Sequence, residues 1–369
     1  MPRANTPSKK SMLLLSHLLL SVDATRQAPE RRTNILDSQL TNISGEDFDE
    51  LAALASSNHV IVRGMENFRS LVERAGNETR AVWAAEAVTA ERARIQNALP
   101  HLHAVCAAFE QEGHDVMVIK SLDHWPDLGS DLDLYSTATP ETVLELMKRR
   151  FSASLAPRSW GDRLARKWNF LIPELPEAVE IHVGRLGQAG EQTVLASSVA
   201  RRARQIRVEG RTFRVPAISD RLMISALQRM YRHFYFRLCD IVDSAVLVES
   251  GAVDYDDLER AATAAGIWEG MATYLVIVSD YVNQYRGSGL DLPRSVRATA
   301  RFGGDKVCFA REFLRVPILP QSAGLYRTQL TALLRRRELE STVRLGLLPW
   351  LATAAAVGQK ITGSNKGIW

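Results

Sequence analysis

Two aspartates separated by a single residue give the sequence its clearest chemical signal. Asp131 and Asp133 alternate with Leu132 and Leu134 in the stretch DLDLY. Side chains of a strand alternate between its two faces, so the carboxylates would point the same way and the leucines into a core. Carboxylates this close repel each other, and their pKa values rise unless a cation lies between them. The pair therefore predicts a cation site, with a divalent metal as its simplest occupant.

A third acid repeats this alternation in the stretch AVEIHV, where Glu180 and His182 share one face. Three carboxylates on adjacent strands are the oxygen ligands that a two-magnesium phosphoryl-transfer site requires. We predict that Asp131, Asp133 and Glu180 are the metal ligands and catalytic residues, and that they bind Mg²⁺ or Mn²⁺. A surface strand with an ion pair is the alternative interpretation of the acids. His182 either packs in the core or orients Glu180 or the acceptor.

Basic side chains follow in a predicted helix of the C-terminal part. The spacing places Arg232, His233 and Arg237 on or near one face, from which a cation could reach a triphosphate. The alternative is the solvated polar face of an amphipathic helix. Asp240 and Asp243, flanked by apolar residues, are predicted to pair with such arginines and not to bind metal.

The acids need a small sheet to position them. Strands are predicted over residues 116–119, 131–135, 168–172 and 178–183, with a helix from Pro140 to about Arg150 and a hairpin around Gly210. Asp123 and Asp127, in the loop before the acid pair, are predicted to be solvent-exposed acids that cap turns.

Helices are predicted on both sides of this sheet. Ser44 starts one of them, others cover residues 65–75 and 79–110, and Pro100 is expected to divide the second. From the cap Ser219-Asp220 the pattern is helical almost to the end. The fold class is therefore α+β. Its predicted parts are a tail with an apolar helix (1–40), a helical segment (41–112), a mixed-sheet core (113–216) and an all-helical C-terminal domain (217–369).

The composition is that of an ordinary globular protein. The chain has 369 residues, 46% of them hydrophobic and 24% charged, and a net charge of +4. This balance favours anionic ligands without a stable nucleic-acid partner, and no apolar stretch approaches the roughly 20 residues of a membrane span. The apolar run at 12–22 is predicted to be a docked helix, with an export signal as the alternative, and the run at 345–357 a docked helix rather than a membrane-surface segment.

The three cysteines indicate the compartment. Cys106, Cys239 and Cys308 lie far apart in apolar contexts and lack the spacing of metal ligands. They are predicted to be buried thiols in a reducing compartment, and the protein to be cytoplasmic.

The order of these motifs resembles the nucleotidyltransferase superfamily with the polymerase-β-like core, and within it the uncharacterised bacterial nucleotidyltransferases. The similarity spans roughly residues 92–247: an apolar strand ending in Lys-Ser, then SDLDL, then a strand with EIH, then the helical segment from Arg232 to Asp243. In the family the first strand ends in Leu-Lys-Gly, whereas this chain has no glycine there.

The resemblance implies that the chain moves a nucleoside monophosphate from an NTP to a hydroxyl or phosphate of an acceptor and releases pyrophosphate. It implies that Lys120 and Ser121 line the phosphates. Ser130, His182, Arg232 and Arg237 are predicted in addition to bind the nucleotide. The acceptor is an unidentified small molecule or a peptide. Two alternatives remain open: modification of a peptide or protein by the same core, and a catalytically degenerate protein that binds a nucleotide or a partner.

Overall fold

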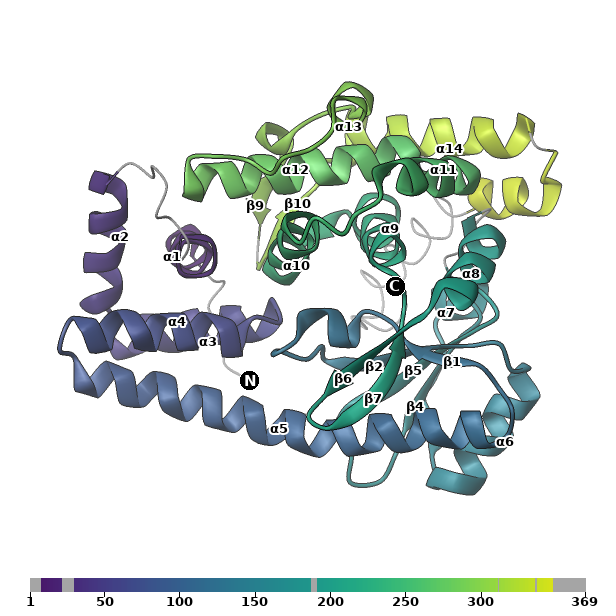
Figure 1. The fold of residues 1–369 in the computed structure, drawn as a ribbon, viewed down its shortest axis with the longest axis horizontal. Helices are drawn as coiled ribbons and strands as arrows, with labels where there is room; N and C mark the ends of the chain where they lie inside the picture. The colour runs from purple at the N-terminus through teal and green to yellow at the C-terminus, as the bar shows by residue number, and fades with distance from the viewer. Residues whose placement is uncertain (1–7, 22–29, 187–190, 311, 336, 348–369) are drawn as a thin grey trace, which may run out of the picture.

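The computed structural model describes residues 8–21, 30–186, 191–310, 312–335 and 337–347. A small mixed sheet lies between helices from both ends of the chain, which makes the fold α+β (Figure 1). The N-terminal helices and the C-terminal helices lie on different sides of the sheet region, and the long helix α5 passes along its outer side in this view.

Five helices form the N-terminal part as far as the structure describes it. They are α1 (Lys9–Leu20), α2 (Glu30–Thr41), α3 (Gly45–Ser57), α4 (Ile61–Arg74) and α5 (Glu78–Gln111). The predicted cap is confirmed, because the Ser44 hydroxyl accepts a hydrogen bond from the backbone N–H of Asp47. The predicted division at Pro100 is wrong, since α5 runs through it. Pro100 is exposed, so the backbone carbonyl that loses its helical partner can bind water instead.

The central sheet has five strands in the order β1-β2-β5-β4-β3. The strands are β1 (Val116–Val118), β2 (Asp131–Ser136), β3 (Ser154–Leu155), β4 (Lys167–Leu171) and β5 (Ala178–Val183). Only the β2–β5 pair is parallel, and its register sets Asp131 beside Ala178 and Asp133 beside Glu180. The strand prediction at 178–183 is confirmed in both bounds, and the others to within one residue.

Helices and a hairpin complete the core region. They are α6 (Pro140–Phe151), α7 (Trp160–Leu164), α8 (Glu191–Arg202), β6 (Arg204–Val208) and β7 (Arg211–Val215). The hairpin turns at Gly210, whose φ of 76° suits glycine, as predicted. The short 3-10 turn η1 (Ser121–His124) lies in the connection between β1 and β2, the strand that carries Asp131 and Asp133.

The C-terminal part is mainly helical. Its helices are α9 (Ile218–Gln228), α10 (Leu238–Glu249), α11 (Tyr255–Ala265), α12 (Trp268–Arg286), α13 (Arg294–Thr299) and α14 (Ala323–Arg335), with the short turns η2 (Arg229–His233), η3 (Gly304–Lys306) and η4 (Ile318–Ser322). The sequence did not indicate a small sheet of β8 (Tyr235–Phe236), β10 (Phe313–Arg315) and β9 (Cys308–Ala310). The edge strand β9 leaves Cys308 exposed, whereas Cys106 and Cys239 are buried as predicted.

The start of α9 also differs from expectation. Ala217 is the N-cap residue and makes no side-chain hydrogen bond there. Asp220 instead forms an ion pair with Arg202, whose guanidinium also contacts Asp257. The predicted Ser219-Asp220 cap is therefore wrong: the buried Asp220 carboxylate pairs with Arg202, and this arginine connects α8, α9 and α11.

One hydrophobic cluster extends from Met12 to Leu325 through the helices and the sheet. Helix α1 belongs to it and packs on α3, α4 and α12, which agrees with the prediction of a docked helix. A Cβ on Gly64 of α4 would lie 3.0 Å from Leu15, so glycine allows α1 to approach closely. In the described part of the chain, no helix has the length and apolar character to cross a membrane. The segment 345–357 falls almost wholly outside the described residues.

Substitution of Leu15 tests how much α1 contributes. Leu15→Ala should lower the free energy of unfolding by about 3 kcal/mol, because Leu15 is fully buried and the closely packed helices cannot collapse into the cavity. Leu13→Ala makes the same change on a partly buried position of the same helix and should cost less than half as much. Urea unfolding measures both, and equal losses would show that α1 is not anchored through Leu15.

Candidate active site

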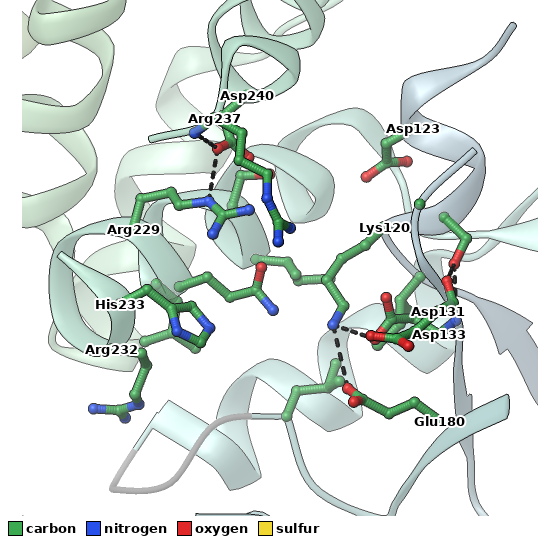
Figure 2. Close-up of a pocket in the computed structure, with 18 of the residues that line it drawn as sticks. Lys120, Asp123, Asp131, Asp133, Glu180, Arg229, Arg232, His233, Arg237 and Asp240 are labelled. Atoms are coloured by element: carbon green, nitrogen blue, oxygen red, sulfur yellow. Dashed lines mark hydrogen bonds and ion pairs between the residues drawn. The ribbon is translucent and has the colours of Figure 1, made fainter. Parts of the chain in front are cut away.

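The three predicted acids lie together on one wall of a cavity of about 310 Å³ (Figure 2). Asp131 and Asp133 come from β2, and Glu180 from the parallel strand β5. The register sets Asp133 and Glu180 side by side, and the side-chain alternation turns Asp131 to the same face. The structure therefore brings Glu180 next to an acid pair that precedes it in the sequence by almost fifty residues.

Lys120 reaches the same acids from the turn after β1. Its backbone has φ 63° and ψ −57°, and the Ser121 N–H donates to the Ile119 carbonyl over 2.6 Å, which defines a γ-turn. Non-glycine residues rarely adopt this conformation, at a cost of about 1–3 kcal/mol. The turn directs the ammonium onto Asp133, in a close ion pair, and to 3.5 Å from a Glu180 oxygen. Lys120 therefore contacts the acids, while its predicted contact with phosphates stays a prediction.

Glu180 is held by three partners. Lys167, on β4, lies 2.7 Å from one carboxylate oxygen, and the His182 Nε2 lies 2.9 Å from the other, which Lys120 also approaches. Burial raises the pKa of Glu180, but Lys120, His182 and Lys167 outweigh burial and hold that pKa well below its usual range. Burial and the adjacent charge of Glu180 instead raise the pKa of Asp133.

Asp131 lies at the more exposed end of the acid strand. Among the described residues its carboxylate has no hydrogen bond or ion pair. Burial and the nearby Glu180 raise its pKa, and Lys120, Lys167 and Arg237 oppose this rise only in part. A cation bound directly to this carboxylate would lower the pKa further.

The two serines of the predicted phosphate loop differ in role. The Ser121 hydroxyl donates to the backbone carbonyl of Asp131 over 3.1 Å and accepts from the N–H of Asp133 over 2.8 Å. Ser121 is buried and fixes β2 against the turn. Ser130 lines the cavity next to the acids, where a ligand can reach it.

Arginines from the helical part form the opposite wall. The π-turn η2 follows α9 and carries Arg229, Arg232 and His233, whereas Arg237 precedes α10. The Arg229 guanidinium pairs with the Asp240 carboxylate at 2.7 Å, and the backbone N–H of Arg237 donates a hydrogen bond to the same carboxylate. The Arg237 side chain extends toward the cavity centre in Figure 2, while Arg232 extends away from it. Burial and neighbouring cations lower the pKa of His233, so this imidazole is neutral.

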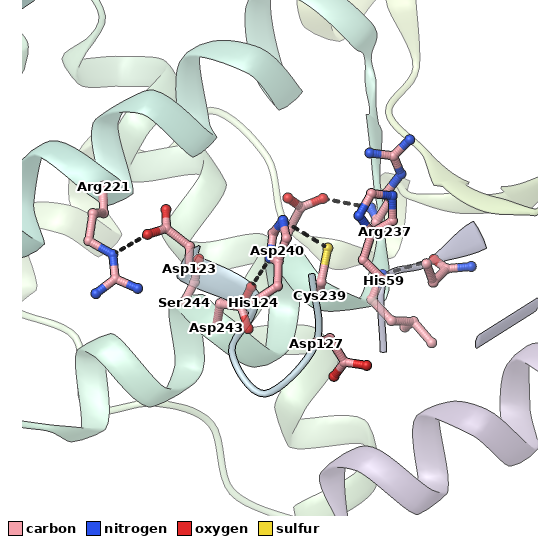
Figure 3. Close-up of polar contacts among 12 residues, drawn as sticks. His59, Asp123, His124, Asp127, Arg221, Arg237, Cys239, Asp240, Asp243 and Ser244 are labelled. Carbon is pink, nitrogen blue, oxygen red and sulfur yellow. Dashed lines mark hydrogen bonds and ion pairs between the residues drawn. The ribbon is translucent and has the colours of Figure 1, made fainter. Parts of the chain in front are cut away.

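A second buried network lies beside this wall (Figure 3). Asp243 accepts from His124 Nδ1 at 2.5 Å. It also accepts from Arg63 at 2.6 Å, and Arg63 contacts Asp127 at 2.7 Å. Cys239 lies 3.9 Å from the other nitrogen of His124. Asp240 and Asp243 do pair with arginines, but the pairs are with Arg229 and with Arg63 of α4, whereas the predicted partners were Arg232 and Arg237. This network joins α4, η1 and α10, and its His124 and Asp243 also line the cavity.

The prediction of exposed loop acids is wrong. Asp127 is fully buried and accepts hydrogen bonds from Arg63 and the backbone N–H of Val62. Asp123 pairs with Arg221 at 2.6 Å. Burial raises the pKa of both carboxylates, and the arginines oppose that rise. The loop is held down by these ion pairs, which its polar sequence did not reveal.

Sequence reasoning did not select Lys167, Asp162 or Arg229. Lys167 also contacts Asp162 at 3.0 Å, and Asp162 forms a capping box with Ser159 at the start of α7. The alternation of β4 could have identified Lys167, since it shares a face with Asn169. Arg229 precedes Arg232 by three residues, a helical spacing that could have grouped them.

The donor set suits a hard divalent cation. Asp133, Glu180 and His182 each offer a ligand atom within 4.8 Å of the others, and Asp131 adds an unpaired carboxylate beside them. Carboxylate oxygens are the preferred ligands of Mg²⁺ and Mn²⁺. The residues present therefore fit such an ion, although Lys120 already lies against two of them.

Comparisons with known proteins give little. No family model matches the chain, and no curated protein matches it. One solved structure, an antigenic nucleotidyltransferase-like protein from Paracoccidioides brasiliensis, aligns over 52% of this chain and 93% of its own, with 11% identity and a TM-score of 0.31. A similarity this low supports no argument about function.

Removal of the Asp243 charge tests the buried network that Asp243 forms with His124 and Arg63. Asp243→Asn should lower the free energy of unfolding at pH 7 by about 3 kcal/mol, because two buried cations lose a partner. Burial raises the pKa of Asp243, but Arg63 and His124 hold it below its usual value. The stability it contributes is therefore present above a pH of about 3.9 and is lost as pH falls through the lowered native pKa.

Denaturant unfolding at pH 7 and pH 3 measures this difference. The gap between wild type and variant should shrink at pH 3. Asp47→Asn, on an exposed pair with Lys10, should cost about 0.5 kcal/mol or less at both pH values. A gap for Asp243→Asn that stays constant with pH would contradict the ionic role.

Proposed function

We propose that this protein is a nucleotidyltransferase that moves a nucleoside monophosphate from an NTP to a hydroxyl or phosphate of an acceptor and releases pyrophosphate, with Mg²⁺ or Mn²⁺. One observation carries the proposal: Asp131, Asp133 and Glu180 project from two parallel neighbouring strands into a cavity whose other wall is arginine-rich. Acids that hold a metal, facing cations that hold phosphates, are the arrangement that phosphoryl transfer requires.

Each wall has its own task in this proposal. Asp131, Asp133 and Glu180 would hold the metal ion, which neutralises phosphate charge and lowers the pKa of the acceptor hydroxyl. Arg237 would bind the triphosphate, and Arg229 and Asp240 fix the direction of the wall from which it extends. Ser130 and His182 lie beside the acids, where they can contact the nucleotide or orient Glu180.

The acceptor is proposed to be a small molecule or a peptide. The cavity of about 310 Å³ lies between the sheet and η2, and its described lining has acids on one side and arginines on the other. Modification of a peptide or protein uses the same chemistry, because only the acceptor differs.

A second candidate function is nucleotide binding without transfer. The ion pair of Lys120 with Asp133 favours it, because an ammonium group there competes with a metal ion for the acids. Nucleotide binding in the absence of pyrophosphate release, with all four NTPs and several acceptors, would support this candidate.

A direct assay tests the transfer. Labelled ATP, CTP, GTP and UTP are incubated with the protein and Mg²⁺ or Mn²⁺, and released pyrophosphate is counted. The double variant Asp131→Asn/Asp133→Asn keeps the shape of both side chains and should lose at least about 100-fold in rate, because metal-bound charge stabilisation is removed. Equal signals from wild type and variant would refute the proposed function.

Arg237 tests the phosphate wall. Arg237→Met should weaken NTP binding by about tenfold, the value of one charge-assisted contact. Arg315→Met is the matched control, since Arg315 packs its guanidinium 5.0 Å from the Tyr235 ring but does not line the cavity. Calorimetry with a non-hydrolysable NTP measures both affinities. If the two variants bind NTP equally well, Arg237 does not contact the phosphates.

A further inference from the structure

The ammonium of Lys120 lies where a cation between Asp133 and Glu180 would lie (Figure 2). We propose that Lys120 is a built-in cation of the acid site, and that the site therefore binds one divalent cation per chain and not two. This inference rests on the proposed function, because it concerns the same acids.

The backbone commits Lys120 to this place. The γ-turn at Lys120 keeps φ at 63°, although a side chain makes that conformation unfavourable. Ser121, which follows it, is tied through its hydroxyl to the backbone of β2 on both sides of Leu132. The lysine side chain is 15% exposed, and its partners Asp133 and Glu180 are 14% and 10% exposed. A side chain enclosed to this degree is part of the site and does not sample the solvent freely.

Glu180 has little capacity left for a metal ion. One of its oxygens contacts Lys167 at 2.7 Å, and the other is shared by His182 at 2.9 Å and Lys120 at 3.5 Å. A second divalent ion at Glu180 would have to displace at least one of these partners.

The charges on the sheet wall also favour a single divalent ion. This wall has four carboxylates, those of Asp131, Asp133, Asp162 and Glu180, and two ammonium groups, those of Lys120 and Lys167, which contacts both Asp162 and Glu180. Two negative charges then remain unmatched, and one divalent cation neutralises them. A second ion would leave an excess of two positive charges in a partly buried site, which is unfavourable.

The open position is at the outer acid. The Asp131 carboxylate has no ion pair or hydrogen bond among the described residues, and Asp131 is the most exposed of the three acids. The single ion is therefore assigned to Asp131 and Asp133, with Lys120 on the inner side.

Binding of Mn²⁺ alone, followed by electron paramagnetic resonance without nucleotide, tests the inference independently of activity. Wild type should bind one ion per chain. Lys120→Met keeps the length of the side chain but removes its charge, so it should bind the first ion at least about tenfold more tightly and take up a second. Lys120→Arg keeps the charge and should retain one ion, with an affinity within about threefold of wild type.

Lys167→Met is the matched control. It removes a positive charge from the other oxygen of Glu180 but leaves Lys120 between the acids, so it should still bind one ion, with a smaller gain in affinity. Thermal unfolding of each variant verifies that it is folded.

The outcomes separate the two proposals. Two ions bound by wild type, or the same number and affinity for Lys120→Met, would overturn the role of Lys120 and leave the proposed transfer standing. Absence of Mn²⁺ binding by both folded proteins would also overturn the one-ion inference, while the pyrophosphate assay decides the transfer separately, because a metal ion can enter such a site together with the phosphates of the NTP.

Discussion

The burial of the Glu180 carboxylate is the constraint on which the site depends. A buried carboxylate costs several kcal/mol unless charges and hydrogen bonds compensate it. Three elements supply that compensation: β4 brings Lys167, β5 brings His182, and the turn after β1 brings Lys120. The sheet order β1-β2-β5-β4 is what places these sources around one carboxylate. The strand order that forms the sheet is therefore also what balances the buried charge of Glu180.

Local sequence patterns predicted the pieces of this arrangement well. The alternation of acidic and aliphatic residues predicted the bounds of β5 and placed Asp131 and Asp133 on one face. Such a pattern can be recognised from the residues of the strand alone, because its side chains alternate with a period of two. The same patterns could not predict the parallel register of Asp133 with Glu180. That register depends on how α6, α7 and β4 return the chain, which no short stretch records. The metal, the nucleotide and the domain boundaries stay predictions.

The misses share a physical origin in tertiary contacts. Asp127 was predicted to be an exposed acid in a turn, but its ion pair with Arg63, more than sixty residues earlier, offsets the cost of burying its charge. Pro100 looked like a helix end, but packing of α5 against α4 and the sheet region sustains the helix across it. The helix expected after Gln228 gives way to a π-turn and a strand, because Tyr235 and Phe236 pair with β10 from far along the chain. Propensity decides such segments only where packing does not.

Helix α5 has a consequence for how the site is supported. Its 34 residues form an unbroken rod of about 50 Å that packs on α4 at one end and on β1, β7 and α6 at the other. This one helix therefore connects the N-terminal helices directly to the acid-bearing sheet. On the arginine wall, in contrast, the π-turn after α9 interrupts the regular helix. The two walls of the site thus differ in backbone support, because regular strands carry the acids and an irregular turn carries Arg229 and Arg232.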